Sequence, residues 1–167
     1  VEDAVRTRVG QVDWLFVIAG GGGGTGSACY ELDSSLNRYL QSIEASGKVV
    51  YIITKPTAQE LLNPTIKTNY SSLLEDVAGA PHIIIDNERQ LQLLRGKAGL
   101  LNMMPVANKN FAKLLAQVFK LADEHTEIQT FDSKDLERCL STPGRMILGS
   151  TVVRDVTRSD LGSLVYQ

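Results

Sequence analysis

Blocks of apolar residues alternate along the chain with segments of mixed polarity, and this pattern predicts a regular succession of strands and helices. Three apolar runs have the length of a strand, at 13–19, 49–53 and 82–85. Unbroken apolar runs of that length are typical of strands buried on both faces of a parallel sheet. The first ten residues are helix-like and close at Gly10, so a short helix is predicted before the first strand.

The segments between these runs have helical spacing. Apolar residues recur every three or four positions from Ala28 to Ile43, which predicts one amphipathic helix ended by Gly47. A second helix is predicted at 65–77, where Pro64 fits the first turn. Strands that alternate with helices through short joints predict a three-layer, Rossmann-like α/β fold with a parallel sheet.

The last third of the chain is predicted to hold a long helix and a short one. Apolar residues lie on one face of 108–123, as in a long amphipathic helix. After a polar joint, a shorter helix begins at Asp132 and is stopped by Thr142-Pro143-Gly144. Residues 145–153 are predicted to form a final strand.

Composition places the chain among globular proteins. It has 167 residues, of which 43% are hydrophobic, enough apolar material for a core. The formal net charge of −2 gives no basic excess of the kind that nucleic acid or an anionic membrane favours. The apolar runs are far shorter than a membrane span. Cys29 and Cys139 fit no metal-ligand spacing and no disulfide framework, which favours a reducing, cytoplasmic compartment.

The most informative segment is a run of glycines between a predicted strand and a predicted helix. It reads Gly20, Gly21, Gly22, Gly23, Gly24, Thr25, Gly26, Ser27. Glycines there let a ligand approach the backbone without Cβ contacts, and their N–H groups can converge on an anion. The helix start and the two hydroxyls add further donors. The segment is not a Walker loop, because no Gly-Lys-Ser/Thr follows, and it is no convincing dinucleotide fingerprint. A flexible glycine linker is the alternative.

Residues 22–28 of this run resemble the glycine box of the tubulin/FtsZ superfamily, which wraps nucleotide phosphates and usually ends in a glycine where Ala28 stands. Further landmarks of that family follow in order. Thr54-Lys55-Pro56 is similar to the family's turn after the next strand, and Glu60 falls where the family places an acidic residue toward the ribose. Pro64 stands where the bacterial division proteins carry an arginine, so that contact is lost or supplied differently. A solvated loop glutamate is the alternative for Glu60.

Two asparagines match the positions with which the family reads the guanine base. Asn87 follows the third strand, and Asn108 opens the long helix within an Ala-Asn pair. A side-chain amide offers both a donor and an acceptor, as the guanine edge requires. Each has a structural alternative, Asn87 as a helix cap and Asn108 as a surface residue. Met104 stands where the family often has an aromatic residue against the base.

Two acids match the Asp-x-x-Asp of the family's synergy loop, whose carboxylates contact the nucleotide of the next subunit in a filament. They are Asp132 and Asp135, and the resemblance implies that both are catalytic. Thr130 stands where the family frequently has an asparagine. The same spacing at a helix start is also a capping arrangement with Asp132 as the N-cap, and both interpretations can hold together.

The resemblance spans essentially the whole chain, and residues 85–87 and 142–144 are most similar to the plasmid and phage TubZ-type branch. It implies that 1–104 is part of a GTP-binding domain whose opening strands lie upstream of Val1. It also implies that 105–124 is the central helix and that 125–167 holds the synergy loop and the start of a second domain.

By the same resemblance, the protein is expected to bind GTP and GDP with Mg²⁺ and to form head-to-tail filaments with copies of itself. GTP would be hydrolysed where two subunits meet. A DNA-binding adaptor or phage cargo is the further partner expected, in the cytoplasm of a bacterial cell. No membrane, no direct nucleic-acid contact and no metal ligand from the chain are expected.

Three other functions stay open. A cell-division GTPase of the FtsZ type fits the same motifs. A scaffold that binds nucleotide without hydrolysing it fits them too. A Rossmann-like dinucleotide enzyme is disfavoured, because Thr54-Lys55 stands where a ribose-binding Asp or Glu is expected at the end of the second strand.

Overall fold

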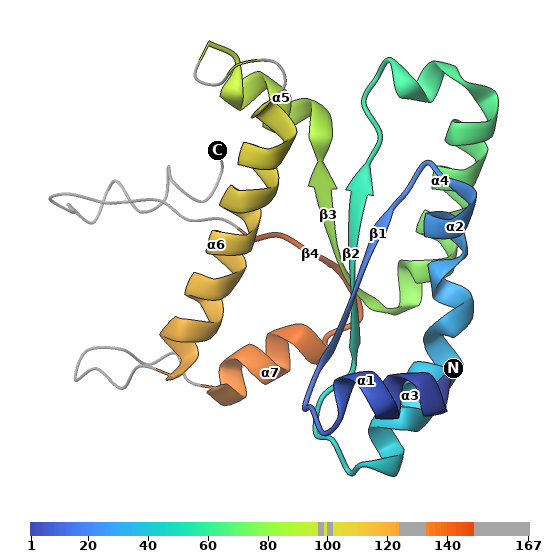
Figure 1. Cartoon of the computed structure of the whole chain (residues 1–167), viewed down its shortest axis with the longest axis vertical. Coiled ribbons are helices and arrows are strands. Elements are labelled where there is room, and N and C mark those ends of the chain that lie inside the picture. The colour runs from blue at the N-terminus through green and yellow to red at the C-terminus, as the bar shows by residue number, and fades with distance from the viewer. Residues whose placement is uncertain (97–98, 100–101, 124–132, 149–167) are drawn as a thin grey trace, which may run out of the picture.

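A computed structural model of the chain describes residues 1–96, 99, 102–123 and 133–148. It confirms the α/β class and the parallel sheet, in which the described residues form four strands in the order β1-β2-β3-β4 (Figure 1). The strands are β1 (Leu15–Gly20), β2 (Val49–Lys55), β3 (Pro81–Asp86) and β4 (Gly144–Met146). The helices are α1 (Glu2–Val9), α2 (Gly24–Ser27), α3 (Asp33–Ser42), α4 (Pro64–Asp76), α5 (Asn87–Leu94), α6 (Met103–Asp123) and α7 (Ser133–Ser141). Among the described residues, no helix combines the length and the apolar character needed to cross a membrane.

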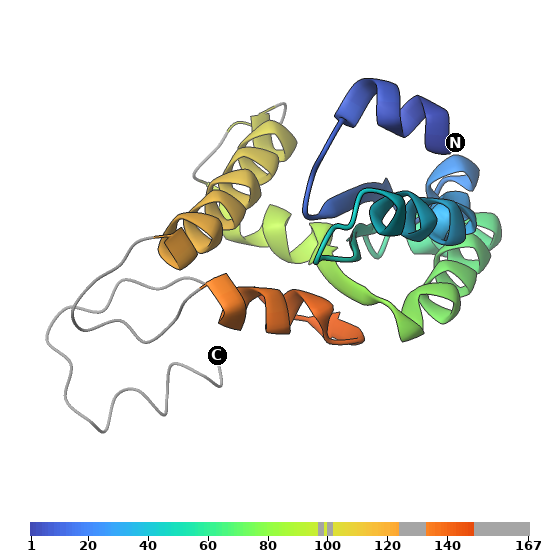
Figure 2. The same ribbon diagram turned by 90° about the horizontal axis from the view of Figure 1, so that it is seen from below.

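Helices cover both faces of the sheet, so the molecule has three layers. In Figures 1 and 2, α1 to α4 lie on one side of the strands and α6 and α7 on the other. Successive side chains of a strand point to opposite faces, and β2 follows this rule. Tyr51 packs in the cluster of α3 and α4, whereas its neighbour Val50 packs against Leu136 and Leu140 of α7.

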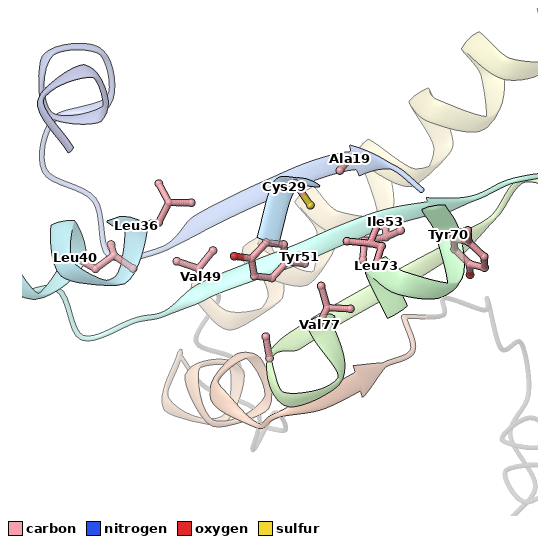
Figure 3. Packing of buried hydrophobic residues seen from close by; sticks show 11 residues of the cluster. Ala19, Cys29, Leu36, Leu40, Val49, Tyr51, Ile53, Tyr70, Leu73 and Val77 are labelled. Carbon is pink, nitrogen blue, oxygen red and sulfur yellow. The ribbon is translucent and has the colours of Figure 1, made fainter. Parts of the chain in front are cut away.

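The larger core lies between β2 and the two helices α3 and α4 (Figure 3). Its buried side chains include Leu36, Leu40, Val49, Tyr51, Ile53, Leu73 and Val77. The hydroxyl of Tyr51 donates a hydrogen bond to Asp33 Oδ1 at 2.9 Å, so the buried phenol is satisfied. Burial and this hydrogen bond raise the pKa of Tyr51 above its ordinary value. Strand β2 is therefore the fixed centre of the sheet.

Strand β2 and helix α4 confirm the predictions made for residues 49–53 and 65–77. Residues 49–53 are buried at every position, and β2 continues for two residues, to Lys55. Helix α4 begins at Pro64, and the side chain of Asn63 caps it by accepting a hydrogen bond from the N–H of Thr65 at 2.9 Å. This start places the first turns of α4 against the glycine run.

The expectation that the first strand is buried on both faces is wrong. Strand β1 is the edge strand of the sheet, and only the face toward α3 and α4 is well covered. On the other face, Phe16 meets Phe119 of α6 edge-on, with ring centroids 5.6 Å apart. Ile18, two residues further on, is 69% exposed. An apolar run alone does not distinguish an edge strand from a central one.

The single helix expected from Ala28 to Ile43 is also wrong in its bounds. The chain forms the short helix α2, a 3₁₀ turn at Ala28–Leu32 and then α3, which ends at Ser42. After α3 the chain turns at Glu44, whose φ of 56° lies in the left-handed region. Gly47 does not stop the helix. A Cβ there would overlap the carbonyl oxygen of Asp13 and the ring of Trp14, so the glycine lets two segments pack closely.

The last elements agree with the prediction only in part. Helix α6 covers the long helix expected at 108–123 and begins five residues earlier. Helix α7 begins at Ser133, and Asp132 lies outside the described residues. The strand expected at 145–153 is a short β4 that ends at Met146 because it pairs with β3 only at Pro81–Ile83. Residues 149–153 lie outside the described part of the chain.

Candidate functional site

The carboxyl ends of β1, β2 and β3 surround a cleft of about 400 Å³. Its lining comes from the ends of β1 and β2, from the segments that follow the three strands and from α4, namely Gly20, Gly21, Gly22, Gly23, Thr54, Pro56, Glu60, Ile66 and Asn87. Open parallel sheets bind their ligands at this edge. The fold thus brings together residues 20–23 of the glycine run, Glu60 and Asn87, which were predicted separately from the sequence, whereas residues 24–27 of the run are not among the lining.

Three glycines of the run are required by packing. A Cβ on Gly21 would come within 2.5 Å of the Tyr70 ring, and one on Gly22 within 2.9 Å of Ile66 Cγ2. A Cβ on Gly26 would overlap the carbonyl oxygen of Gly20. Real Cβ atoms do not approach this closely, so these glycines let the loop fold tightly onto α4 and β1.

Gly23 and Gly24 have no such explanation. A Cβ on either would meet nothing within 4 Å, and neither residue has a positive φ. The described fold would accept a larger residue at both places. A ligand that lies against the backbone accounts for glycine there, since a side chain would occupy its space.

Every carbonyl group from Gly21 to Gly24 is engaged within the protein. The donors are Ser27 Oγ for Gly21 at 3.2 Å, Asn69 Nδ2 for Gly22 at 3.2 Å, the Ser27 N–H for Gly23 at 2.9 Å and the Ala28 N–H for Gly24. Within the described chain, the N–H groups of Gly22, Gly23 and Gly24 donate to no acceptor. The exposed backbone of this loop is therefore a donor surface, the chemistry that holds an anion.

The two hydroxyls of the run have different places. Ser27 Oγ donates to the carbonyl of Gly21, so it braces the loop from within. Thr25 is exposed beside Gly24. Of the two, Thr25 is therefore the hydroxyl that a ligand in front of the loop can reach.

Glu60 lines the cleft and is held by a local motif. Its Oε2 accepts hydrogen bonds from the Thr57 N–H at 2.7 Å and the Thr57 hydroxyl at 2.8 Å, and the Glu60 N–H returns one to that hydroxyl. This reciprocal arrangement is a capping box. The Thr-x-x-Glu spacing at 57–60 is the sequence signal for this capping box, which was not among the predicted features. It fixes Glu60 and leaves Oε1 without a partner in the described chain.

Asn87 is not the cap of the helix that it begins. That role belongs to Asp86, whose Oδ1 accepts the N–H of Arg89 at 3.0 Å. Among the described residues the side-chain amide of Asn87 makes no hydrogen bond, and it lines the cleft. The alternative in which Asn87 caps the helix is therefore wrong, and its side-chain amide stays available to a ligand.

An ion pair beside the cleft was not predicted. Lys55 Nζ lies 2.8 Å from Asp86 Oδ2, because the two residues are opposite each other in the β2–β3 register. The hydrogen bond to Asp86 raises the pKa of Lys55 above its ordinary value. Partial burial works to raise the pKa of Asp86, but Lys55 and the backbone N–H of Arg89 outweigh it and lower the net pKa. Only the strand register could have revealed this pair.

Met104 and Asn108 lie on the first turns of α6, at the end of the molecule where α5 begins (Figure 1). This is the same end as the cleft. Neither residue is among those that line the cleft, and both are exposed, Met104 at 38%. The fold thus places these two residues at the same end of the molecule as the cleft but outside its walls.

Within one chain, the predicted catalytic residue Asp135 is far from the cleft. Asp135 lies in the first turn of α7, and Asp132 lies outside the described residues. Helix α7 is near the start of β2, where Lys48 Nζ donates to the carbonyl of Ser141 at 3.5 Å. Figure 1 shows α7 at the end of the sheet from which the strands β2 and β3 point away. The glycine loop and Asp135 therefore lie at opposite ends of the sheet.

The described residues contain no group of three or more His, Cys, Asp or Glu able to hold a metal ion. Compared with models of protein families and with curated protein sequences, the chain matches none. The resemblance to the tubulin/FtsZ superfamily therefore rests on the sequence motifs alone.

Proposed function

We propose that this chain binds GTP in the cleft and assembles head-to-tail into filaments of the tubulin type. The observation that carries the proposal is the glycine loop. Its carbonyl groups accept hydrogen bonds from within the protein, its N–H groups at 22–24 have no acceptor in the described chain, and two of its glycines lack a packing role. A phosphate chain is the ligand that such a donor surface favours.

The other residues of the cleft match the remaining parts of a nucleotide. The phosphates would lie on Gly22, Gly23, Gly24 and Thr25. The carboxylate of Glu60, fixed by Thr57, is suited to accept hydrogen bonds from ribose hydroxyls through its second oxygen. The amide of Asn87 would read the guanine edge.

Asn108 and Met104 would reach the base from the start of α6. This step needs a change of side-chain conformation or a movement of α6, because neither residue lines the cleft. Side-chain changes of that kind are common when a ligand binds. Mg²⁺ would be carried by the phosphates, as is usual for this ion, and no described residue is assigned to it.

The opposite placement of the loop and α7 supports a site shared between subunits. If copies stack along the strand direction, Asp135 of one chain faces the cleft of the next, and the contact repeats without closing. Asp135, together with Asp132, would orient the attacking water. Catalysis would then consist of positioning and electrostatic stabilisation, as is general for phosphoryl transfer.

Light scattering recorded together with phosphate release tests this function. We expect GTP to raise scattering, ATP to leave it flat, and phosphate release per chain to increase with protein concentration, because the site forms only on contact. Equal responses to ATP and GTP, or release independent of protein concentration, contradict the proposal. Scattering with GTP but without release identifies a scaffold that does not hydrolyse its nucleotide.

A further inference from the structure

Asp86 connects three structural elements at the edge of the cleft. It ends β3 and caps α5, because its Oδ1 accepts the Arg89 N–H at 3.0 Å. Its Oδ2 accepts a hydrogen bond from Lys55 Nζ at 2.8 Å, which ties it to the end of β2. One carboxylate oxygen thus holds the backbone at the start of α5, and the other holds the Lys55 side chain at the end of β2.

The residues that follow this pair line the cleft. Lys55 and Asp86 are the last opposed residues of the β2–β3 ladder, and the next residues along the chain are Pro56 and Asn87. The Asn87 side chain has no hydrogen bond of its own within the described chain. Its position is therefore set by the backbone that Asp86 holds.

The ion pair is not explained by stability. The side chains of Lys55 and Asp86 keep 37% and 32% of their exposure, and ion pairs so open to solvent contribute little to folding. Positioning of the neighbouring Asn87 explains the pair better, because a side chain that binds a ligand must be held within about 0.5 Å of its binding geometry by the residues behind it.

We infer that Asp86, through its pair with Lys55, is a positioning residue that sets Asn87 and thereby the preference of the cleft for a guanine base. The inference rests on the proposed function. Asp86 touches no ligand in this account. It acts on the base only through the backbone and amide of its neighbour.

Two variants separate this role from a structural one. Asp86→Asn keeps an N-cap, since asparagine caps helices as well as aspartate does, but it faces Lys55 with an amide donor. Lys55→Met removes the pair from the other side and leaves the cap. Arg38→Met is the matched control, because it breaks the Arg38–Glu2 pair, 3.2 Å long and exposed, on α1 and α3.

Calorimetric titration with GTP and with ATP gives the ratio of the two Kd values for each variant. We expect Asp86→Asn and Lys55→Met to reduce the preference for GTP by about three- to tenfold, the effect of one weakened hydrogen bond. Arg38→Met should leave the ratio unchanged. In an Asn87→Ala background, Asp86→Asn should change the ratio no further.

An unchanged ratio in both pair variants overturns the inference, as does an equal further loss in the Asn87→Ala background. A lower melting temperature with equal loss for both nucleotides also overturns it, since that is what a merely structural pair predicts. Wild-type protein that binds neither nucleotide, or both equally, overturns the proposed function itself, and the inference with it.

Discussion

Replacing Gly24 by alanine should separate folding from nucleotide binding. A Cβ at this position meets nothing within 4 Å. Gly24 begins α2, and its φ is not positive. A glycine-to-alanine change at a compatible position stabilises a protein by about 0.4–1 kcal/mol, because it restricts the unfolded chain. For a chain of this size that corresponds to a rise of about 1–4 °C in Tm.

The same methyl group should weaken GTP binding. It would stand on the exposed side of the loop, where the proposal places the phosphates. Loss of one N–H hydrogen bond to a charged phosphate oxygen costs about 1.5–3 kcal/mol, and this loss raises Kd by about 10- to 150-fold. Gly24→Val should act more strongly and abolish assembly, with the fold retained.

Thermal melts and calorimetric titration with GTP are the two assays. Gly26→Ala is the control, because its Cβ would overlap the carbonyl oxygen of Gly20 and it should lower the Tm sharply. The reasoning is refuted if Gly24→Ala binds GTP with wild-type affinity. It is also refuted if Gly24→Ala loses stability as Gly26→Ala does, since Gly24 would then have a packing role.

Asn108→Ala should weaken GTP binding by about 1–3 kcal/mol without lowering the Tm, because Asn108 is exposed; equal affinities of wild type and variant in a calorimetric titration speak against a base contact. Asp135→Ala should bind GTP normally and hydrolyse it slowly in long-lived filaments; normal phosphate release per sedimented chain with a lower Tm would make it a helix cap of about 1 kcal/mol. The lowered pKa of Asp86 means that its contribution to stability is complete above about pH 4, the ordinary range of a carboxyl group, and is lost as the pH falls through the lower folded value. Asp86→Asn should therefore flatten this part of the acid-unfolding curve, by about 1 kcal/mol or less because the pair is exposed, and an unchanged curve would contradict the assignment.

The elements that depend on local pattern could be predicted from the sequence. Strand β2 is apolar at five successive buried positions, and α4 has a proline at its first turn with an asparagine cap before it. The glycine run could be recognised as a loop between strand and helix for the same reason. Each of these features is decided by neighbours a few residues away.

What depends on the position of a strand in the sheet could not be predicted. Ile18 and Ile52 look alike in sequence, but Ile18 lies on an edge strand and is exposed, whereas Ile52 is fully buried in a central one. The Lys55–Asp86 pair arises from the strand register, which joins residues 31 positions apart. The sequence likewise could not show which glycines are needed for packing, because this depends on the contacts of the loop with Tyr70 and Ile66 of α4.

Amide signals of the glycine loop in nitrogen-15 correlation spectra report directly on phosphate binding. We propose that the N–H groups of Gly22, Gly23 and Gly24, which have no acceptor in the described chain, bind the phosphates of GTP. Adding GTP with Mg²⁺ should move these three signals downfield, as new hydrogen bonds to charged oxygens form, and ATP at the same concentration should move them far less. Signals that stay in place while GTP saturates the protein would contradict the account, because the nucleotide would then bind elsewhere.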